Sequence, residues 1–346
     1  MRPDERLDVG ALGDWLKGRL EGADRPLEVR QFAGGHANLT YLLRLGEAAG
    51  ALEYVLRRPP LDPVAPGSHD MSREHRVLSV LWRAFPLAPR SYLFCEDAAV
   101  IGAPFFVMER RRGVVVRGGV PACFGGGEDV VANRKLSEVV VDVLADFHAA
   151  DPKPAGLDTL GHPEGFLRRQ VEGWAGRWER AKTEQNELAD EMAKWLLANL
   201  PESPAPTLLH NDWRLDNMAV AEDDPGRCVA VYDWDMCTRG DPLADLGTVL
   251  SVWHDPDEAP GFPSAMPVNL PGSLDRHGAA SRYAVRRACD LSGLDYYVVF
   301  GTFKMAVVLQ QIYYFRYHQG QTRDARFAGM GEGAKALFRL AAARRP

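Results

Sequence analysis

The pattern of apolar residues changes near Gly113, and this change limits the folds that the chain can adopt. Before it, residues 28–32, 39–45 and 52–58 are short runs of leucine, β-branched and aromatic residues bounded by glycine or proline, which is typical of strands. Beyond the arginine run at 110–112, apolar residues recur at helical spacing. The sequence therefore predicts a small antiparallel sheet up to Gly113 and a larger, mainly helical part after it.

Two further elements complete the expected sheet part. Residues 98–109 are predicted as a pair of strands joined by a turn at 102–104. Residues 72–85 place apolar side chains at helical spacing, with Ser72 as the expected N-cap. We therefore expect one helix to pack on the small sheet.

Five stretches of the larger part show the period of amphipathic helices. They are residues 136–149, 166–182, 187–200, 296–317 and 329–343. The proline-rich and partly acidic segment 255–271 is expected to be a surface loop. The division predicts an α+β protein with two domains, residues 1–113 and residues 114–346.

Composition and charge exclude several classes of function. The 346 residues include 41 basic and 47 acidic side chains, a net charge of −6, so no overall positive field is available to hold nucleic acid or an anionic membrane. The apolar stretch 296–317 is interrupted by Lys304, Gln310, Gln311 and Arg316, which are costly at bilayer depth. We expect neither a nucleic-acid partner nor a membrane span.

The cysteines and the amino terminus indicate a cellular location. The five cysteines are an odd number without C-x-x-C spacing, which favours a reducing compartment over a disulfide framework or a zinc site. The charged start of the chain is not followed by the apolar run of a signal peptide. The expected location is the cytoplasm.

The strongest chemical signal is a pair of polar segments that each follow a short apolar run. His210-x-Asp212-x4-Asn217 follows one run, and Asp233 follows the next. The spacing matches the catalytic loop and the later metal-binding aspartate of kinases. Asp212 is the candidate base that orients an attacking hydroxyl, whereas Asn217 and Asp233 offer oxygen ligands that suit Mg²⁺. The alternative is a capped loop whose polar side chains satisfy local backbone amides.

The neighbours of this motif have less specific interpretations. Arg214 either reaches a transferred phosphate or pairs with a nearby acid. His148 fits the C-terminal end of a helix, where the macrodipole favours it.

These motifs, with others along the chain, resemble one known family. In order, the matching segments are Phe32-x-Gly34-Gly35-x-x-Asn38-x-Thr40-Tyr41, Tyr54 to Pro60, Arg73 to Leu78, Phe105 to Glu109, His210 to Asn217, Asp233-Trp234-Asp235 and Gly240-Asp241-Pro242-x-x-Asp245-Leu246. The sequence is similar over nearly its whole length to the aminoglycoside phosphotransferase family, and more narrowly to the branch of kinase domains linked to acyl-CoA dehydrogenases. The resemblance implies a protein-kinase-like bilobal fold, with a nucleotide-binding lobe, residues 1–113, that ends in the hinge. It also implies that Asp245 braces the catalytic loop rather than binds metal.

The resemblance also implies a nucleotide site in the first lobe. Gly34, Gly35 and Asn38 lie between two strands, where small residues let backbone amides approach phosphates. The family binds adenine through the backbone of a hinge, here Met108 and Glu109. ATP and Mg²⁺ are the cofactors implied, and GTP stays open.

One position departs from the protein-kinase pattern. Strand alternation puts Val55 and Arg57 on one face, and Arg57 stands where protein kinases have a lysine. Glu74, on the following helix, is the implied partner. The alternative is that Arg57 and Arg58 are solvated charges on an edge strand.

The expected function is transfer of the γ-phosphate of ATP to a hydroxyl group of a small molecule. The aromatic stripe of 296–317, interrupted by cationic and amide side chains, favours a hydroxyacyl or carboxylated acceptor. Two alternatives remain open: an antibiotic kinase of the aminoglycoside type, and a nucleotide-binding pseudokinase that acts as an interaction module. The oligomeric state is not indicated.

Overall fold

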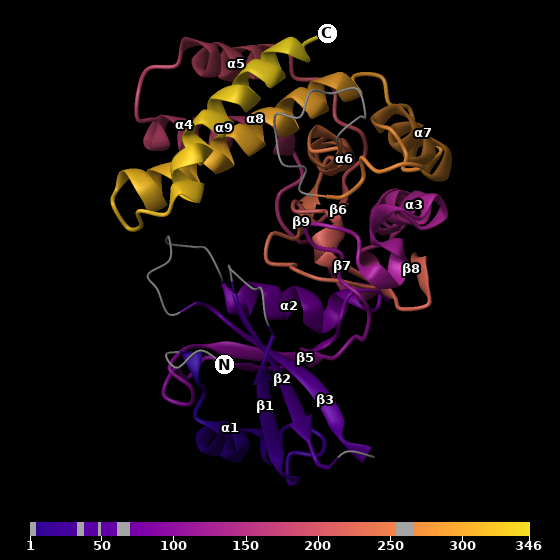
Figure 1. Cartoon of the computed structure of the whole chain (residues 1–346), viewed down its shortest axis with the longest axis vertical. Helices are drawn as coiled ribbons and strands as arrows, with labels where there is room; N and C mark the ends of the chain where they lie inside the picture. Colours follow the sequence, from indigo (N-terminus) through magenta and orange to yellow (C-terminus); the bar gives the residue numbers. More distant parts are fainter. Residues whose placement is uncertain (1–4, 33–37, 48–49, 61–69, 254–265) are drawn as a thin grey trace. The chain divides into compact units, whose positions relative to one another are not determined.

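The computed structural model describes the chain except for residues 1–4, 33–37, 48–49, 61–69 and 254–265. The described chain divides into two compact units (Figure 1). The first unit contains Met1–Gly113 and two later segments, Asp151–Asp158 and Val229–Cys237. The second contains Val114–Ala150, Thr159–Cys228 and Thr238–Pro346. The main segment of the first unit ends at Gly113, and the return of two later segments to that unit is not visible in the sequence.

The first unit is built on a five-stranded antiparallel sheet in the order β1-β2-β3-β5-β4. Its strands are β1 (Leu27–Gln31), β2 (Leu39–Leu45), β3 (Leu52–Arg58), β4 (Ser91–Cys95) and β5 (Phe105–Glu109). Because β3 pairs with β2 on one side and with β5 on the other, it is a central strand. The edge-strand interpretation of Arg57 and Arg58 is therefore wrong, and both arginines are buried.

Each face of this sheet is associated with one helix. Helix α1 (Val9–Leu16) contributes Leu12 and Leu16 to a core that includes Tyr41 and Leu56. Helix α2 (Met71–Leu81) packs on β4 and β5. The expectation of a single helix was incomplete because α1 is short and contains two glycines, which weaken the helical signal.

Two local predictions in the first unit are wrong. The strand after α2 is Ser91–Cys95, and residues 98–101 form a turn instead of the expected strand. The N-cap of α2 is Asp70, not Ser72: the Asp70 carboxylate accepts hydrogen bonds from the backbone N–H groups of Ser72 and Arg73 at 2.9 and 3.1 Å. The positive end of the helix dipole also stabilises a carboxylate at this position.

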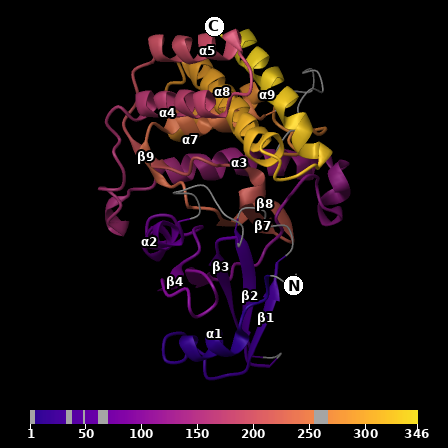
Figure 2. The same cartoon turned by 90° about the vertical axis from the view of Figure 1, so that its left-hand side faces the viewer.

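The second unit is mainly helical (Figure 2). Its helices are α3 (Val130–Ala149), α4 (Phe166–Ala181), α5 (Glu187–Ala198), α6 (Pro242–Ser251), α7 (Arg276–Arg287), α8 (Leu294–Ile312) and α9 (Ala325–Ala343). A π-helical turn, η6 (Tyr313–His318), follows α8. Short strands pair β6 (Thr207–Leu209) with β9 (Thr238–Gly240), and β7 (Met218–Ala221) with β8 (Asp224–Val231). Only the carboxyl end of β8, from Val229, belongs to the first unit. The five expected helices are present, although α3 begins at Val130 rather than Leu136.

Helix α8 is the central helix of the second unit, in contact with α4, α6 and α9. Leu294–His318 is long and apolar enough to cross a bilayer, but 56% of its most apolar window is buried inside the structure. We therefore describe α8 as a core helix. The expected loop 255–271 lies mostly outside the described residues.

Candidate active site

The H-x-D-x4-N segment follows β6, and the carboxylate of Asp245 anchors its backbone. Asp245 lies in the first turn of α6 and is buried. Its Oδ2 accepts a hydrogen bond from the N–H of His210 at 2.7 Å, and its Oδ1 accepts one from Asn211 at 2.8 Å. Burial would raise the pKa of Asp245, but the backbone donor of His210 and the ring of His148 hold it below its usual value. The bracing role expected for Asp245 is what the geometry shows.

Two further contacts fix the backbone ahead of Asp212. Asn211 adopts a left-handed conformation with φ of 67°, which is unusual for a residue other than glycine. Lys304 of α8 donates a hydrogen bond to the Asn211 carbonyl at 2.8 Å. The Nδ1 atom of the buried His210 accepts from the N–H of Asp212 at 3.2 Å. His210 thus orients the loop through its ring.

Asn217 connects the end of the segment to Asp212. Its side-chain N–H group donates to the Oδ2 atom and to the backbone oxygen of Asp212, both at 2.9 Å. Asn217 is 8% exposed, whereas the Asp212 side chain is 40% exposed. The amide nitrogen is therefore held, and the amide oxygen is the atom that suits a hard cation. A carboxylate that remains accessible beside it can receive a proton from a hydroxyl group.

Arg214 pairs with an acid of its own loop. Its Nε atom lies 2.8 Å from Asp216 Oδ1 and 3.7 Å from Asp212 Oδ2. Burial raises the pKa of Asp216, and Arg214 opposes the rise. Of the two interpretations of Arg214, the ion pair is the one that the structure contains.

The first unit holds a second cluster, in which one guanidinium contacts two carboxylates. Arg57 of β3 donates to Glu74 Oε1 of α2 at 2.7 Å and forms an ion pair with Asp233. Asp233 follows β8 and has a φ of 68°, a sparsely populated conformation that recurs at functional sites. The N–H of Trp234 also donates to Glu74 Oε1, at 3.3 Å.

Burial dominates the electrostatics of this cluster. The Glu74 side chain is fully buried, and burial raises its pKa to about 7 against the opposing charge of Arg57. Burial alone would lower the pKa of Arg57, but the charges of Glu74 and Asp233 raise it above its usual value. Glu74 Oε2 has no hydrogen-bond partner among the described residues. Arg57 thus stays charged and compensates two acids.

Of the other residues predicted to bind the nucleotide, the structure describes some and not others. Val55 pairs with Met108 across β3 and β5, and both side chains are buried. The Glu109 carboxylate lies 2.8 Å from Arg111 Nε. Asn38 is buried. Gly34 and Gly35 lie outside the described residues.

The contacts of two buried residues were not predicted. His148 was assigned to a helix end, but its ring lies 2.6 Å from the Tyr283 hydroxyl and 3.4 Å from Asp245. Asp241 caps α6, and its Oδ2 accepts from the Tyr297 hydroxyl at 2.7 Å. Both contacts join segments more than 50 residues apart, so periodicity carries no signal of them.

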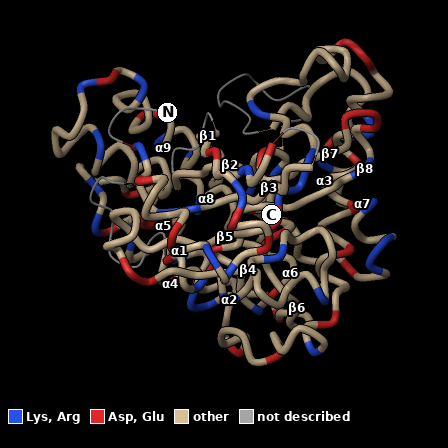
Figure 3. Tube along the Cα trace, turned by 90° about the horizontal axis from the view of Figure 1, so that it is seen from below, with Lys and Arg blue, Asp and Glu red and all other residues tan. Residues whose placement is uncertain are grey.

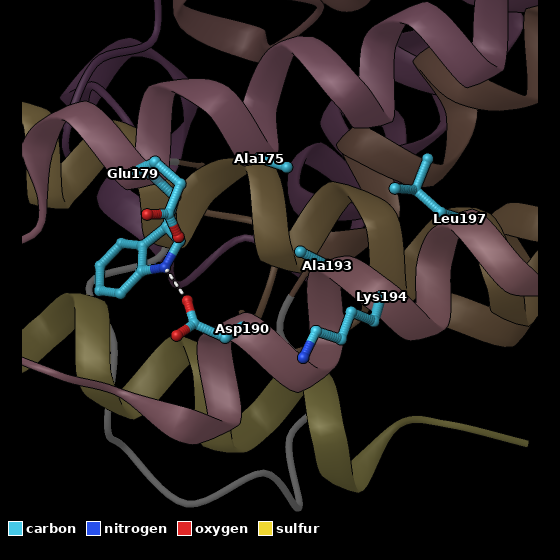
Figure 4. Close-up of a pocket in the computed structure, with 7 residues that line it drawn as sticks. Ala175, Glu179, Asp190, Ala193, Lys194 and Leu197 are labelled. Carbon is cyan, nitrogen blue, oxygen red and sulfur yellow. Dashed lines mark hydrogen bonds between the residues drawn. The ribbon is translucent and has the colours of Figure 1, made fainter.

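A pocket of about 300 Å³ lies between α4 and α5 (Figure 4). Its lining residues are Ala175, Trp178, Glu179, Asp190, Ala193, Lys194 and Leu197. The indole N–H of Trp178 donates to Asp190 at 2.7 Å. None of the predicted site residues lines this pocket.

The predicted chemistry is thus divided between the two units. Asp212 and Asn217 meet in the second unit, whereas Arg57, Glu74 and Asp233 meet in the first. Within the described ranges, no three His, Cys, Asp or Glu side chains are grouped so that they could hold a metal ion. The amide oxygen of Asn217 and the carboxylate of Asp233 are each of the ligand type that Mg²⁺ prefers, and Mg²⁺ takes few protein ligands and keeps several waters.

Known proteins resemble this chain in sequence and in fold. Acyl-CoA dehydrogenase family member 11 of Gallus gallus is 31% identical over 90% of the chain, and the match spans 40% of that protein's length. A Ralstonia eutropha protein, named as a candidate aminoglycoside phosphotransferase, is 28% identical with a TM-score of 0.82 and 98% coverage of both chains. An aminoglycoside phosphotransferase solved with AMP-PNP and hygromycin B is 17% identical, with a TM-score of 0.57 and coverage of 95% and 98%.

These comparisons confirm the family and the fold predicted from the motifs. The kinase-like neighbours confirm the α+β, protein-kinase-like fold. The acyl-CoA dehydrogenase relative, of which the chain spans 40%, is similar to the chain as the narrower branch predicts. The model of the phosphotransferase enzyme family matches residues 28–264. The chain therefore belongs to the phosphotransferase enzyme family.

Proposed function

We propose that the chain is a kinase that uses ATP and Mg²⁺ to phosphorylate a hydroxyl group of a small molecule. The observation that carries this proposal is the pairing of Asp212 with Asn217 in a braced loop of a phosphotransferase-family chain. Asp212 is accessible, and Asn217 presents an amide oxygen. A loop that only satisfied its own backbone would not need a half-exposed carboxylate.

In the proposed reaction the proton of the acceptor hydroxyl goes to Asp212, and the phosphoryl group goes to the acceptor oxygen. The acceptor hydroxyl gives its proton to Asp212, and its oxygen forms a bond to the γ-phosphorus. The bond from that phosphorus to the β–γ bridging oxygen breaks, and ADP leaves with the electron pair. Mg²⁺, held by Asn217 and Asp233, would neutralise charge on the phosphates.

The nucleotide is assigned to residues of the first unit. Backbone groups at Met108 and Glu109 would bind adenine, with Val55 beside the ring. Gly34, Gly35 and Asn38 would approach the phosphates, and the pair of Arg57 with Glu74 would orient them. The complex of a structural neighbour with AMP-PNP supports ATP as the donor.

The class of acceptor is proposed from the relatives of the chain. A hydroxyacyl or carboxylated molecule fits the similarity to an acyl-CoA dehydrogenase family member. Basic and acidic residues are interspersed along the trace (Figure 3), which gives no support to a nucleic-acid substrate.

We place the activity in the cytoplasm, in keeping with the five free cysteines.

The decisive test compares two aspartate substitutions. Asp212→Asn removes the proposed base, and Asp223→Asn removes an exposed carboxylate whose ion-pair partner is Arg227. With ATP, Mg²⁺ and a panel of hydroxylated acceptors, the wild type and Asp223→Asn should release ADP and form a phosphorylated product. Asp212→Asn should lose turnover while it still binds ATP. EDTA should abolish turnover, and excess Mg²⁺ should restore it.

Three results would change the proposal. Normal turnover by Asp212→Asn would remove the assignment of the base. ATP binding without turnover on any acceptor would favour a pseudokinase, for which the replacement of lysine by Arg57 is the motivation. Reduced drug susceptibility of a sensitive bacterium that expresses the chain would favour an antibiotic kinase.

A further inference from the structure

Two cations share one aromatic ring in the second unit. Arg177 lies one helical turn after Trp174 on α4, with its guanidinium carbon 4.5 Å from the indole ring centre. Lys304 of α8 places its ammonium 5.7 Å from the same ring. We call Trp174, Arg177 and Lys304 the cationic cluster.

Arg177 has no acidic partner in the part of the chain that the structure describes. Among the described residues it takes part in no ion pair or hydrogen bond, and the charged group that acts on it most is Arg180. Burial and that second positive charge both lower the pKa of Arg177. A half-buried guanidinium normally forms charge-assisted hydrogen bonds. The chain has a net charge of −6, yet none of the described acidic residues pairs with Arg177. The guanidinium is therefore available to an external anion.

A third donor belongs to the same cluster. The Trp174 side chain is only 7% exposed, and its indole N–H is buried without an acceptor in the part of the chain that the structure describes. Buried indole N–H groups usually find a hydrogen-bond partner. The cluster thus offers unused donors of two kinds.

Lys304 connects the cluster to the proposed base. Its ammonium donates to the carbonyl of Asn211, the residue before Asp212. The carboxylates of Asp245 and Asp212 both act on this ammonium, as does the positive charge of Arg177. The cationic cluster therefore lies next to the position at which the acceptor hydroxyl would react.

We propose that the cationic cluster recognises an anionic group of the acceptor, with Arg177 as its main ligand. A planar guanidinium binds a carboxylate or a phosphate through two parallel hydrogen bonds, and both anions share this chemistry. The inference rests on the proposed kinase function and specifies its substrate class. A polycationic acceptor would be repelled by the same residues.

The experiment uses matched acceptors that differ in one charge. Hydroxycarboxylic acids of increasing chain length are compared with their methyl esters, and hydroxyalkyl phosphates with the corresponding diols. The wild type should use the acid or the phosphate with the higher kcat/KM, and the better of the two identifies the anion. An aminoglycoside provides the cationic acceptor.

Three variants then separate recognition from folding. Arg177→Gln should lower kcat/KM for the anionic acceptor roughly 10- to 100-fold, the loss expected for a charge-assisted hydrogen bond. It should leave the neutral acceptor and the KM for ATP unchanged. Arg177→Lys should recover part of the loss. Arg168→Gln, which removes an exposed arginine of the same helix, should behave as wild type.

The outcomes distinguish this inference from the function on which it rests. Turnover that prefers neutral or cationic acceptors, or an equal loss by Arg177→Gln on both members of a pair, would overturn the inference and keep the kinase. No turnover with any acceptor would overturn both. A normal melting temperature of Arg177→Gln shows that the kinetic loss does not come from unfolding.

Discussion

At the scale of single residues, Arg57 compensates two carboxylates with one side chain. Arg57→Met should destabilise the protein by about 3–5 kcal/mol, because it leaves the fully buried Glu74 without its cation. Urea unfolding monitored by fluorescence measures the change. The loss should exceed that of a surface ion pair, which is worth at most about 1 kcal/mol.

A double substitution provides the control for this prediction. Arg57→Met combined with Glu74→Gln removes both charges, so the total loss should be smaller than the sum of the two single losses. Additive losses would show that Arg57 and Glu74 do not act as a pair. Arg227→Met, on an exposed ion pair with Asp223, should cost little.

Asp245 determines the backbone geometry ahead of the proposed base. In Asp245→Asn, one oxygen remains to accept from His210 and Asn211, and an amide N–H group faces a backbone N–H. We expect stability to fall by about 1–3 kcal/mol. Once an acceptor is known, kcat should fall at least about tenfold, since misplacement of a catalytic group slows the reaction, while the KM for ATP stays within about twofold. A larger effect on the KM for ATP than on kcat would contradict this role.

At the scale of elements, glycines let α6 pack closely on α8. A Cβ atom at Gly247 would lie 2.5 Å from the backbone of Tyr297, and one at Gly301 would lie 2.7 Å from the Gly247 oxygen. Gly247→Ala should therefore destabilise the protein by about 1–3 kcal/mol through overpacking. Gly329→Ala on α9 meets no atom within 4 Å and should stabilise the helix by about 0.5–1 kcal/mol. Thermal unfolding of both variants measures the difference, and equal melting temperatures would refute the packing argument.

The elements that could be predicted are those with a strong internal pattern. Strand β2 and helices α4 and α9 follow from periodicity, because one face of each is buried and the other is not. Strand β3 is buried on both faces from Tyr54 onward and was predicted from its run of apolar residues. The strand expected at residue 98 failed because Asp97 caps a turn, in which its carboxylate accepts from the N–H of Ala99 at 2.8 Å. That contact competes locally with strand pairing.

The candidate site could be predicted only as far as its motif. The spacing of Asp212 and Asn217 follows from local sequence. The bracing by Asp245, 35 residues from His210, was expected from the family resemblance. The contact of Lys304 with Asn211 joins residues 93 positions apart, and Arg177 gives no motif at all. The proposed specificity therefore depends on contacts that form only when α4 and α8 pack on each other.

At the scale of the whole molecule, stability should depend on pH through a buried histidine. Burial lowers the pKa of His148 below its usual value of 6.5, and Asp245 opposes this effect. The folded state therefore holds His148 neutral at a pH where the unfolded chain takes up a proton. The neutral ring costs nothing above pH 6.5, and stability is lost as the pH falls below that value. Asp245 and Asp241 face this ring, with Arg287 as the cation that opposes its protonation.

When the pH is lowered from about 7 to about 5, the melting temperature of the wild type should accordingly fall relative to that of His148→Gln. Glu74, whose pKa burial raises to about 7, takes up a proton in the folded state and acts in the opposite direction in both proteins. His148→Gln removes the titrating ring, so its melting temperature should fall less than that of the wild type over this interval, although at pH 7 it is lower because the contact with Tyr283 is lost. His277→Gln, on the exposed side of α7, should keep the slope of the wild type. His75, whose pKa burial also lowers, contributes in the same direction, so the slope of His148→Gln should be reduced rather than abolished. An unchanged slope in His148→Gln would show that the proton taken up on unfolding binds elsewhere.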